Sequence, residues 1–78
     1  MKEIEKIFGA VIRRRRKEMK ISQEAFADLA GIHRTYISSI ELGKVQVSIN
    51  IAQKLADTLN TPLSVIWKEI EQELGTKS

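Results

Sequence analysis

Cysteine is absent from this sequence of 78 residues, and so is any long run of apolar residues. Without cysteine there is no disulfide framework, no thiolate metal site and no thiol nucleophile. The single histidine, His33, cannot build a metal site without partners. No nucleophile–base pair or phosphate-binding loop stands out either. We therefore expect no metal, no cofactor, no small-molecule ligand and no enzymatic activity.

The lack of long apolar segments excludes a helix that spans a bilayer. The first apolar stretch runs into a series of arginines, whereas a secretory signal would end in a small-residue cleavage site. We expect a cytoplasmic protein that is not associated with a membrane. Residues 1–78 should form one small domain. Such a chain buries only ~60% of its unfolded surface, so dimerisation would help to stabilise it.

Positive charge is concentrated at the start of the chain. The formal net charge is +3, yet residues 1–21 contain eight basic and three acidic side chains. The remaining residues are slightly acidic. This distribution suits a polyanionic partner, although a mildly basic surface is also common on proteins that never bind one.

Apolar residues recur at helical spacing in five segments, which predicts a compact all-α fold. Ser22 and Ser48 are suited to N-cap two of these helices, and His33 takes the corresponding position before a third. Pro62 is suited to the first position of the last helix. The predicted helices cover about 3–18, 23–30, 34–43, 49–59 and 62–74.

The decisive pattern lies in residues 23–42, QEAFADLAGIHRTYISSIEL. Two short helical patterns meet at Gly31, and glycine enters a left-handed C-cap without steric cost. Ile37 and Ile40 provide inward anchors for the second helix. Seven positions fit a helix-turn-helix, in which the second helix enters the major groove of DNA. They are Phe26, Ala27, Ala30, Gly31, Ile32, Ile37 and Ile40.

The outward face of the second helix is polar and has small side chains. Arg34 could bind guanine O6 and N7, and Tyr36 could pack on a thymine methyl or donate to a phosphate. The smaller hydroxyls could read bases directly or through water. The alternative is an exposed polar face without a partner, which the helix-turn-helix pattern makes the weaker interpretation. The predicted base-reading residues are Arg34, Thr35, Tyr36, Ser38 and Ser39.

Three residues flank this helix and are predicted to contact the DNA backbone. Gln23 begins the preceding helix, whose free N–H groups suit phosphate oxygens. Lys44 and Gln46 lie in the following loop, and Gln46 could instead reach a base. We interpret His33 as a capping or turn residue, with a phosphate contact as the alternative.

The run Arg13-Arg14-Arg15-Arg16-Lys17 could bind phosphates or could be a solvated helix face. Consecutive helical residues point ~100° apart, so these five side chains cannot share one surface. Glu41 lies on the buried side of its predicted helix, where a carboxylate needs a cation. We therefore predict a structural ion pair between Arg16 and Glu41.

The C-terminal segment holds more apolar residues than the core is expected to absorb. Leu63, Ile66 and Trp67 are expected to close the core. The remaining apolar cluster predicts a partner surface, with scattered surface residues as the alternative. The favoured interpretation is a two-fold dimer whose axis matches a palindromic DNA site. Its predicted interface residues are Ile51, Val65, Ile70 and Leu74.

These motifs resemble the lambda-repressor and Cro-like (Xre-type) helix-turn-helix family, over Ile12 to Trp67. The resemblance rests on Ile21-Ser-Gln-Glu, Leu29-Ala-Gly-Ile and Tyr36-Ile-Ser-Ser-Ile-Glu-Leu-Gly-Lys44. Arg34-Thr-Tyr-Ile-Ser38 followed by Ile40-Glu41 is similar to the controller proteins of restriction–modification systems. The sequence departs from the family at Arg15, often Leu, at Lys20, often Gly, and at Val47, often Pro.

The resemblance implies a homodimeric transcription regulator of bacterial or phage origin, associated with the nucleoid, that acts on its own promoter and controls the timing of endonuclease expression. It also implies the Arg16–Glu41 pair and base contacts from Arg34 and Tyr36. The expected partners are double-stranded DNA with a palindromic operator, a second copy of the chain, and RNA polymerase. A phage-type Cro or repressor and the antitoxin of a toxin–antitoxin pair are the alternatives, since they share this scaffold.

Overall fold

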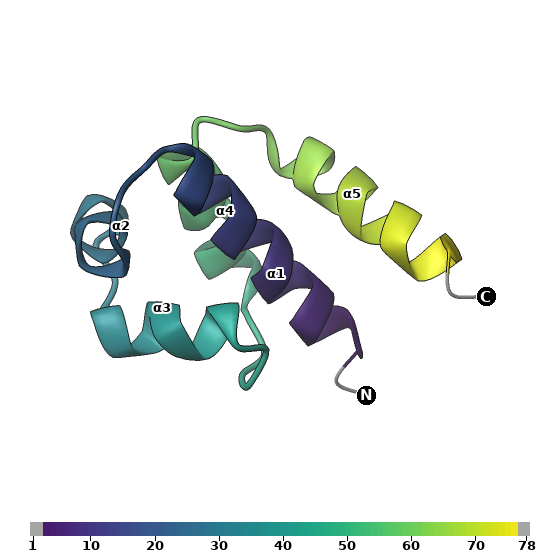
Figure 1. Ribbon diagram of the computed structural model, residues 1–78, viewed down its shortest axis with the longest axis horizontal. Coiled ribbons are helices and arrows are strands. Elements are labelled where there is room, and N and C mark those ends of the chain that lie inside the picture. The colour runs from purple at the N-terminus through teal and green to yellow at the C-terminus, as the bar shows by residue number, and fades with distance from the viewer. Residues whose placement is uncertain (1–2, 77–78) are drawn as a thin grey trace.

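Five α-helices and no strand make up the part of the chain that the structure, a computed structural model, describes, which is residues 3–76 (Figure 1). The all-α, five-helix prediction is confirmed. None of these helices is both long enough and apolar enough to cross a lipid bilayer. The helices are α1 (Glu3–Glu18), α2 (Gln23–Ala30), α3 (Arg34–Glu41), α4 (Ile49–Thr58) and α5 (Leu63–Thr76).

Serine side chains cap α2 and α4 as their positions in the sequence predict. Ser22 Oγ accepts a hydrogen bond from the Ala25 N–H at 3.0 Å, and Ser48 Oγ accepts one from the Ile51 N–H at 3.2 Å. Each bond satisfies one of the free N–H groups of a first helical turn. His33 occupies the N-cap position of α3, but its side chain makes no capping hydrogen bond.

Four helix boundaries differ from the prediction by one or two residues, and the smallest difference is the end of α4 at Thr58 instead of residue 59. α3 ends at Glu41, because Gly43 turns the chain with a φ of 73°. Pro62 precedes α5 and is not its first residue, since its carbonyl accepts the N–H of Val65 at 3.0 Å. α5 continues to Thr76, beyond the predicted end near residue 74, and Leu74 packs against the core in this last part. Tertiary packing of this kind stabilises helix ends that local propensity would leave frayed.

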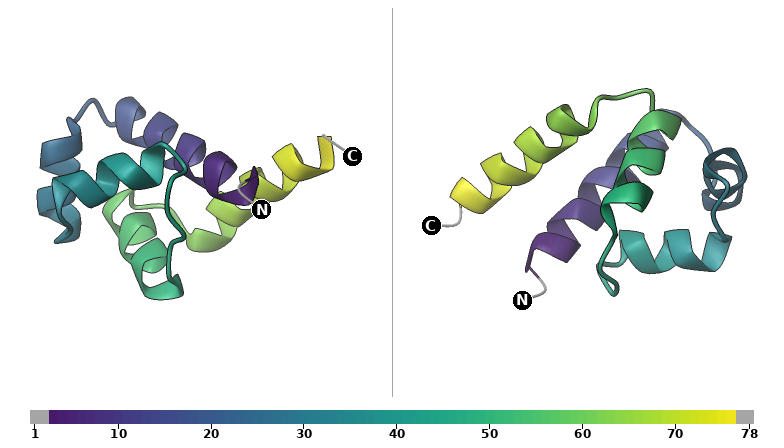
Figure 2. Two further views of the ribbon diagram at one scale, coloured as in Figure 1. Left: turned by 90° about the horizontal axis from the view of Figure 1, so that it is seen from below. Right: turned by 180° about the vertical axis from the view of Figure 1, so that it is seen from behind.

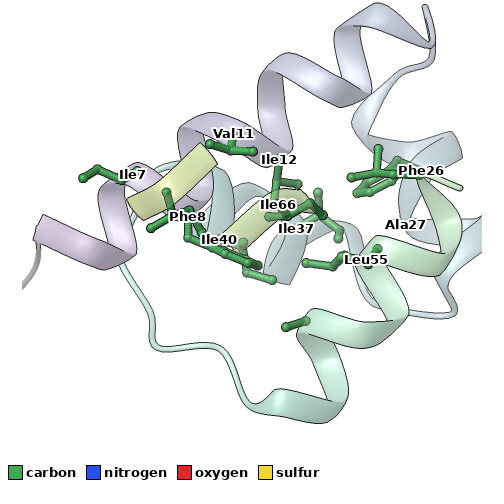
Figure 3. Packing of buried hydrophobic residues seen from close by; sticks show 14 residues of the cluster. Ile7, Phe8, Val11, Ile12, Phe26, Ala27, Ile37, Ile40, Leu55 and Ile66 are labelled. Atoms are coloured by element: carbon green, nitrogen blue, oxygen red, sulfur yellow. The ribbon is translucent and has the colours of Figure 1, made fainter. Parts of the chain in front are cut away.

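Each helix places at least one completely buried side chain in a shared core (Figure 3). This arrangement means that no helix can leave its place without exposing apolar surface, which costs about 25 cal/mol per Å². The representative side chains, all 0% exposed, are Ile12, Phe26, Ile37, Leu55 and Ile66.

α1 lies between α3 and α5 and contacts both, while α2 packs against α3 and α4 (Figures 1 and 2). α3 lies at the lower left of the molecule in Figure 1, with α2 and α4 above it and α1 to its upper right. One face of α3 is therefore directed away from the rest of the described chain.

The inward face of α5 differs from the prediction at Ile70. Ile66 and Ile70 are both 0% exposed, whereas Trp67 keeps 40% of its surface exposed. The prediction that Ile70 is left over for a partner is therefore wrong. Leu63, Ile66, Ile70 and Leu74 recur every three or four residues, which places them on one helical face. Trp67 lies to one side of that face and takes part in the core only at its edge.

Candidate nucleic-acid interface

A tight turn at Gly31 joins α2 to α3. Gly31 adopts a φ of 70°. The Gly31 N–H donates to the Asp28 carbonyl at 3.2 Å, and the Ile32 N–H donates to the Ala27 carbonyl at 2.9 Å. These two bonds satisfy carbonyls at the end of α2. Ile37 and Ile40, 0% and 1% exposed, then anchor α3 in the core. The predicted inward residues of the second helix are confirmed, and their burial fixes which face of α3 points outward.

The five residues predicted to read bases differ in their exposure on α3. Arg34 and Thr35 are exposed, while Ser38 and Ser39 are half-buried. Tyr36 is half-buried as well and packs partly against the core, so its ring is less free than that of an outward residue. Within residues 3–76, the Arg34 guanidinium has no ion pair. Its five donors are therefore available to an external acceptor.

The buried pair predicted between Arg16 and Glu41 is present. Arg16 Nε donates to Glu41 Oε2 at 2.6 Å, and Arg16 Nη2 donates to Glu41 Oε1 at 3.0 Å. The side chains are 9% and 2% exposed. Arg16 Nη1 also donates to the Ile21 carbonyl at 2.8 Å. This bidentate pair ties α1, the loop before α2 and the end of α3 together.

Gln23 takes part in the same network. Its amide Nε2 donates to Glu41 Oε1 at 3.0 Å, a contact that the sequence does not reveal. The side chain thus has a structural partner, while the beginning of α2 still offers backbone N–H groups. Lys44 and Gln46 are exposed in the loop after α3. The α2 N-terminus, through Gln23, and this loop therefore both lie beside the C-terminal end of α3.

The other arginines of the α1 run separate into two groups. Arg14 and Arg15 both form ion pairs with Glu69 of α5, and Arg15 Nη1 lies 3.5 Å from Thr61 Oγ1. Burial raises the pKa of the Glu69 carboxyl, but hydrogen bonds and charge from Arg15 and Arg14 outweigh it. The pKa is therefore lowered below its ordinary value of 4.5. Arg13 and Lys17 remain exposed.

An apolar groove lies at the junction of α1, α4 and α5. The Phe8 and Trp67 rings meet across it with centroids 6.4 Å apart and planes tilted by 43°. The groove is lined by Ile4, Glu5, Phe8, Gln46, Val47, Ala52 and Trp67. α4 and α5 also carry large apolar side chains that are exposed: Ile49 is 82% exposed and Val65 is 39% exposed. Ile51 and Leu74 are half-buried and pack against the core.

The described residues hold no group of three or more potential metal-ligating His, Cys, Asp or Glu side chains. The features that stand out among the described residues are instead a polar helix face with the unpaired Arg34 guanidinium, the exposed Lys44 and the α2 N-terminus beside it, and an apolar groove. They match a nucleic-acid interface with a separate apolar surface.

A family model described as helix-turn-helix matches residues 12–66. The chain belongs to this helix-turn-helix family. It is 40% identical to the control protein C.MunI of Mycoplasma sp over 74 residues, which is 94% of this chain and 100% of that protein. It is 37% identical to the control protein C.SmaI of Serratia marcescens over 59 residues, 76% of this chain and 70% of that one.

Among solved structures, the restriction–modification controller protein C.AhdI from Aeromonas hydrophila is similar, with a TM-score of 0.75. The two chains are 32% identical, over 85% of this chain and 94% of C.AhdI. The predicted resemblance to the helix-turn-helix family and to its controller proteins is confirmed.

Proposed function

We propose that this protein is a homodimeric, sequence-specific DNA-binding transcription regulator that acts as a restriction–modification controller on its own promoter. The observation that carries the proposal is the free Arg34 guanidinium on the outward face of an α3 that is anchored by its buried side. The similarity to two control proteins and to a controller structure supports the same function.

Arg34 is the proposed principal reader of sequence. Two N–H groups of a guanidinium match O6 and N7 of guanine, which is the commonest specific contact in protein–DNA complexes. Thr35, Ser38 and Ser39 would approach neighbouring base edges, and Tyr36 would contact a thymine methyl or a phosphate from the side of the helix. The start of α2 at Gln23, together with Lys44 and Gln46, would fix the position of α3 on the DNA backbone.

We place the dimer contact at the apolar surface around the groove. Ile4 and Trp67 line the groove and are exposed, and exposed Ile49 lies three residues before the groove-lining Ala52 on α4. Exposed Val65 extends the surface along α5, and half-buried Ile51 and Leu74 could contribute at its edges. Ile70 is excluded because it is buried in the core. Two copies related by a two-fold axis would present two α3 helices to the half-sites of a palindrome.

RNA polymerase is a further proposed partner for a protein of this kind acting as an activator. We propose a cytoplasmic location, where operator DNA would be accessible. The protein is proposed to act by binding alone, without catalysis.

The first experiment is fluorescence anisotropy with DNA from upstream of the gene, compared with a scrambled duplex at ~150 mM salt. The operator should bind on the order of 10³-fold more tightly than the scramble. Arg34→Ala should reduce this ratio about 10- to 100-fold, because a bidentate base contact is worth about 1–3 kcal/mol. Arg34→Lys is the matched control: it retains the charge but loses the planar fork, so it should lose specificity and keep non-specific binding.

Equal binding of both duplexes by the wild type would contradict a regulator of its own promoter. Recovery of the protein from its host in a stable complex with a toxin would favour the antitoxin alternative.

The dimer is tested by sedimentation equilibrium of Ile49→Glu. Because Ile49 is 82% exposed, a charge there should leave the fold intact and raise the dimer dissociation constant at least ~10-fold. Leu29→Glu is the control, since Leu29 is 66% exposed but belongs to α2, which contributes no residue to the groove, whereas α4 contributes Ala52. Equal effects of the two substitutions, or none, would contradict the proposed interface.

A further inference from the structure

Some basic side chains of α1 take no part in the ion pairs that the arginine run forms. Arg14 and Arg15 are bound to Glu69, and Arg16 is bound to Glu41. Arg13 and Lys17 are exposed, and so is Lys6, which lies about two helical turns before Arg13. Residues 6, 10, 13 and 17 follow one another at intervals of four, three and four, which places them on one face of the helix. We call Lys6, Arg13 and Lys17 the basic stripe.

The basic stripe is unpaired within the part of the chain that the structure describes. Among residues 3–76, none of its three side chains forms an ion pair with an acidic group. Ala10, the fourth position on this face, is also exposed and is too small to cover its neighbours. The stripe therefore presents three uncompensated positive charges to the surroundings.

One end of the stripe lies against the loop after α3. A Cβ atom on Gly43 would come within 2.7 Å of both Cα and Cγ of Lys6, so the Gly43 backbone rests directly on Lys6. Lys44 follows immediately in the chain. Lys6 is thereby held beside Lys44, which is one of the proposed backbone contacts.

The other end of the stripe lies near the beginning of α2. Arg16, which precedes Lys17, donates to the Ile21 carbonyl and to Glu41, and Glu41 also accepts from Gln23. α1 thus runs from the loop at the end of α3 to the connection that leads into α2 (Figure 1). It links the two places beside α3 that are proposed to contact phosphates.

We propose that Lys6, Arg13 and Lys17 form an additional phosphate-binding track for the operator backbone, continuous with Lys44 at one end and the α2 N-terminus at the other. The proposal rests on the proposed DNA-binding function and adds three contacts that do not read sequence. From residue 6 to residue 17 the stripe extends about 16 Å along the helix. That length is sufficient to reach across a major groove ~12 Å wide.

A purely structural role accounts for only part of the stripe. Cations near the C-terminal end of a helix are favoured by its dipole, which suits Lys6 and Lys44 beside the end of α3. Lys17 lies in the last turn of α1 and is stabilised by the dipole of that helix, but Arg13 lies more than one turn before the end of α1 and gains little from it. The charge of Arg13 is therefore better matched to an external polyanion.

The test is the salt dependence of DNA binding by Arg13→Gln/Lys17→Gln, measured by anisotropy with operator and scrambled duplexes. Each lost phosphate contact lowers the slope of log K against log salt by about 0.9. We expect a decrease of about 1.8 for the double variant, equal weakening on both duplexes, and an unchanged specificity ratio. Lys6→Gln, which keeps the Cγ beneath Gly43, should lower the slope by about 0.9.

Lys54→Gln/Lys68→Gln is the matched control, because it removes the same charge from exposed positions on α4 and α5. If its slope falls as much as that of the stripe variant, net charge and not position is responsible, and the track is wrong. An unchanged slope in the stripe variant has the same meaning. These outcomes are separate from the proposed function, which fails only if the wild-type protein shows no preference for the operator.

Discussion

Two glutamates bind arginines from the same run on α1, but they do so in different surroundings. Glu41 is 2% exposed and meets Arg16 in a bidentate contact inside the core. Glu69 is 25% exposed and binds Arg14 and Arg15, which are 51% and 21% exposed, at the surface between α1 and α5. Three consecutive arginines thus serve two contacts of very different burial.

The difference shows how surroundings set the value of the same chemical pair. Removing one partner of a buried pair strands a charge where water cannot solvate it. At the surface, water and salt ions replace a lost partner, and exposed pairs contribute about 0–1 kcal/mol. We therefore expect the α1–α3 contact to be essential for the fold of the candidate interface. The α1–α5 contact should adjust stability only slightly.

The largest expected effect comes from breaking the buried pair with Glu41→Ala. The unfolding free energy should fall by about 3–5 kcal/mol, because Arg16 remains buried without a counter-charge. Urea denaturation followed by circular dichroism measures the loss. In a domain of this size a loss of that order is a large part of the total free energy of unfolding.

The double variant Arg16→Met/Glu41→Leu is the control for this prediction. It removes both charges and fills similar volume, so it should recover most of the lost stability. If the double variant is as unstable as Glu41→Ala, the cause is lost packing or the lost Gln23 and Ile21 contacts, and the stranded charge is not the explanation.

A smaller effect is expected from Glu69→Gln. At neutral pH the unfolding free energy should fall by at most about 1 kcal/mol, and the difference should shrink at 1 M salt, where screening is strong. The pKa of Glu69 is lowered in the folded state. Its contribution is therefore complete above the ordinary value of 4.5 and is lost as the pH falls through the depressed folded value.

Urea denaturation of wild type and Glu69→Gln from pH 7 to pH 2 checks this sign. The two stability curves should converge at the acidic end. Glu71→Gln, an exposed residue two positions away on α5, is the control and should follow the wild type throughout. A difference between Glu69→Gln and wild type that grows toward low pH would contradict the assignment.

The two contacts also differ in whether the sequence predicts them. The Arg16–Glu41 pair follows from the sequence, because Glu41 shares a helical face with buried isoleucines and requires a cation. The Glu69 contacts do not follow, since nothing in the chain relates Arg14 to a residue 55 positions away until α5 is placed beside α1. The departure at Arg15, where the family often has Leu, was visible in the sequence. Its partner was not.

At Lys20, where the family often has glycine, the backbone adopts a conformation that favours glycine. Lys20 adopts a φ of 62° at the end of α1, which is the left-handed conformation that glycine enters without steric cost. A non-glycine residue in that region is under strain of about 1–2 kcal/mol. The end of α1 is therefore slightly strained at Lys20.

Local interactions were sufficient to determine the five helices, their serine caps and the Gly31 turn, because capping bonds and backbone conformations depend on residues a few positions apart. The outward face of α3 followed as well, since its inward isoleucines leave one direction for Arg34 and Thr35. The rotation of α5 depended on tertiary structure. Its apolar residues surround much of the helix, and only contact with α1 and α4 decided that Ile70 is buried while Trp67 stays at the surface.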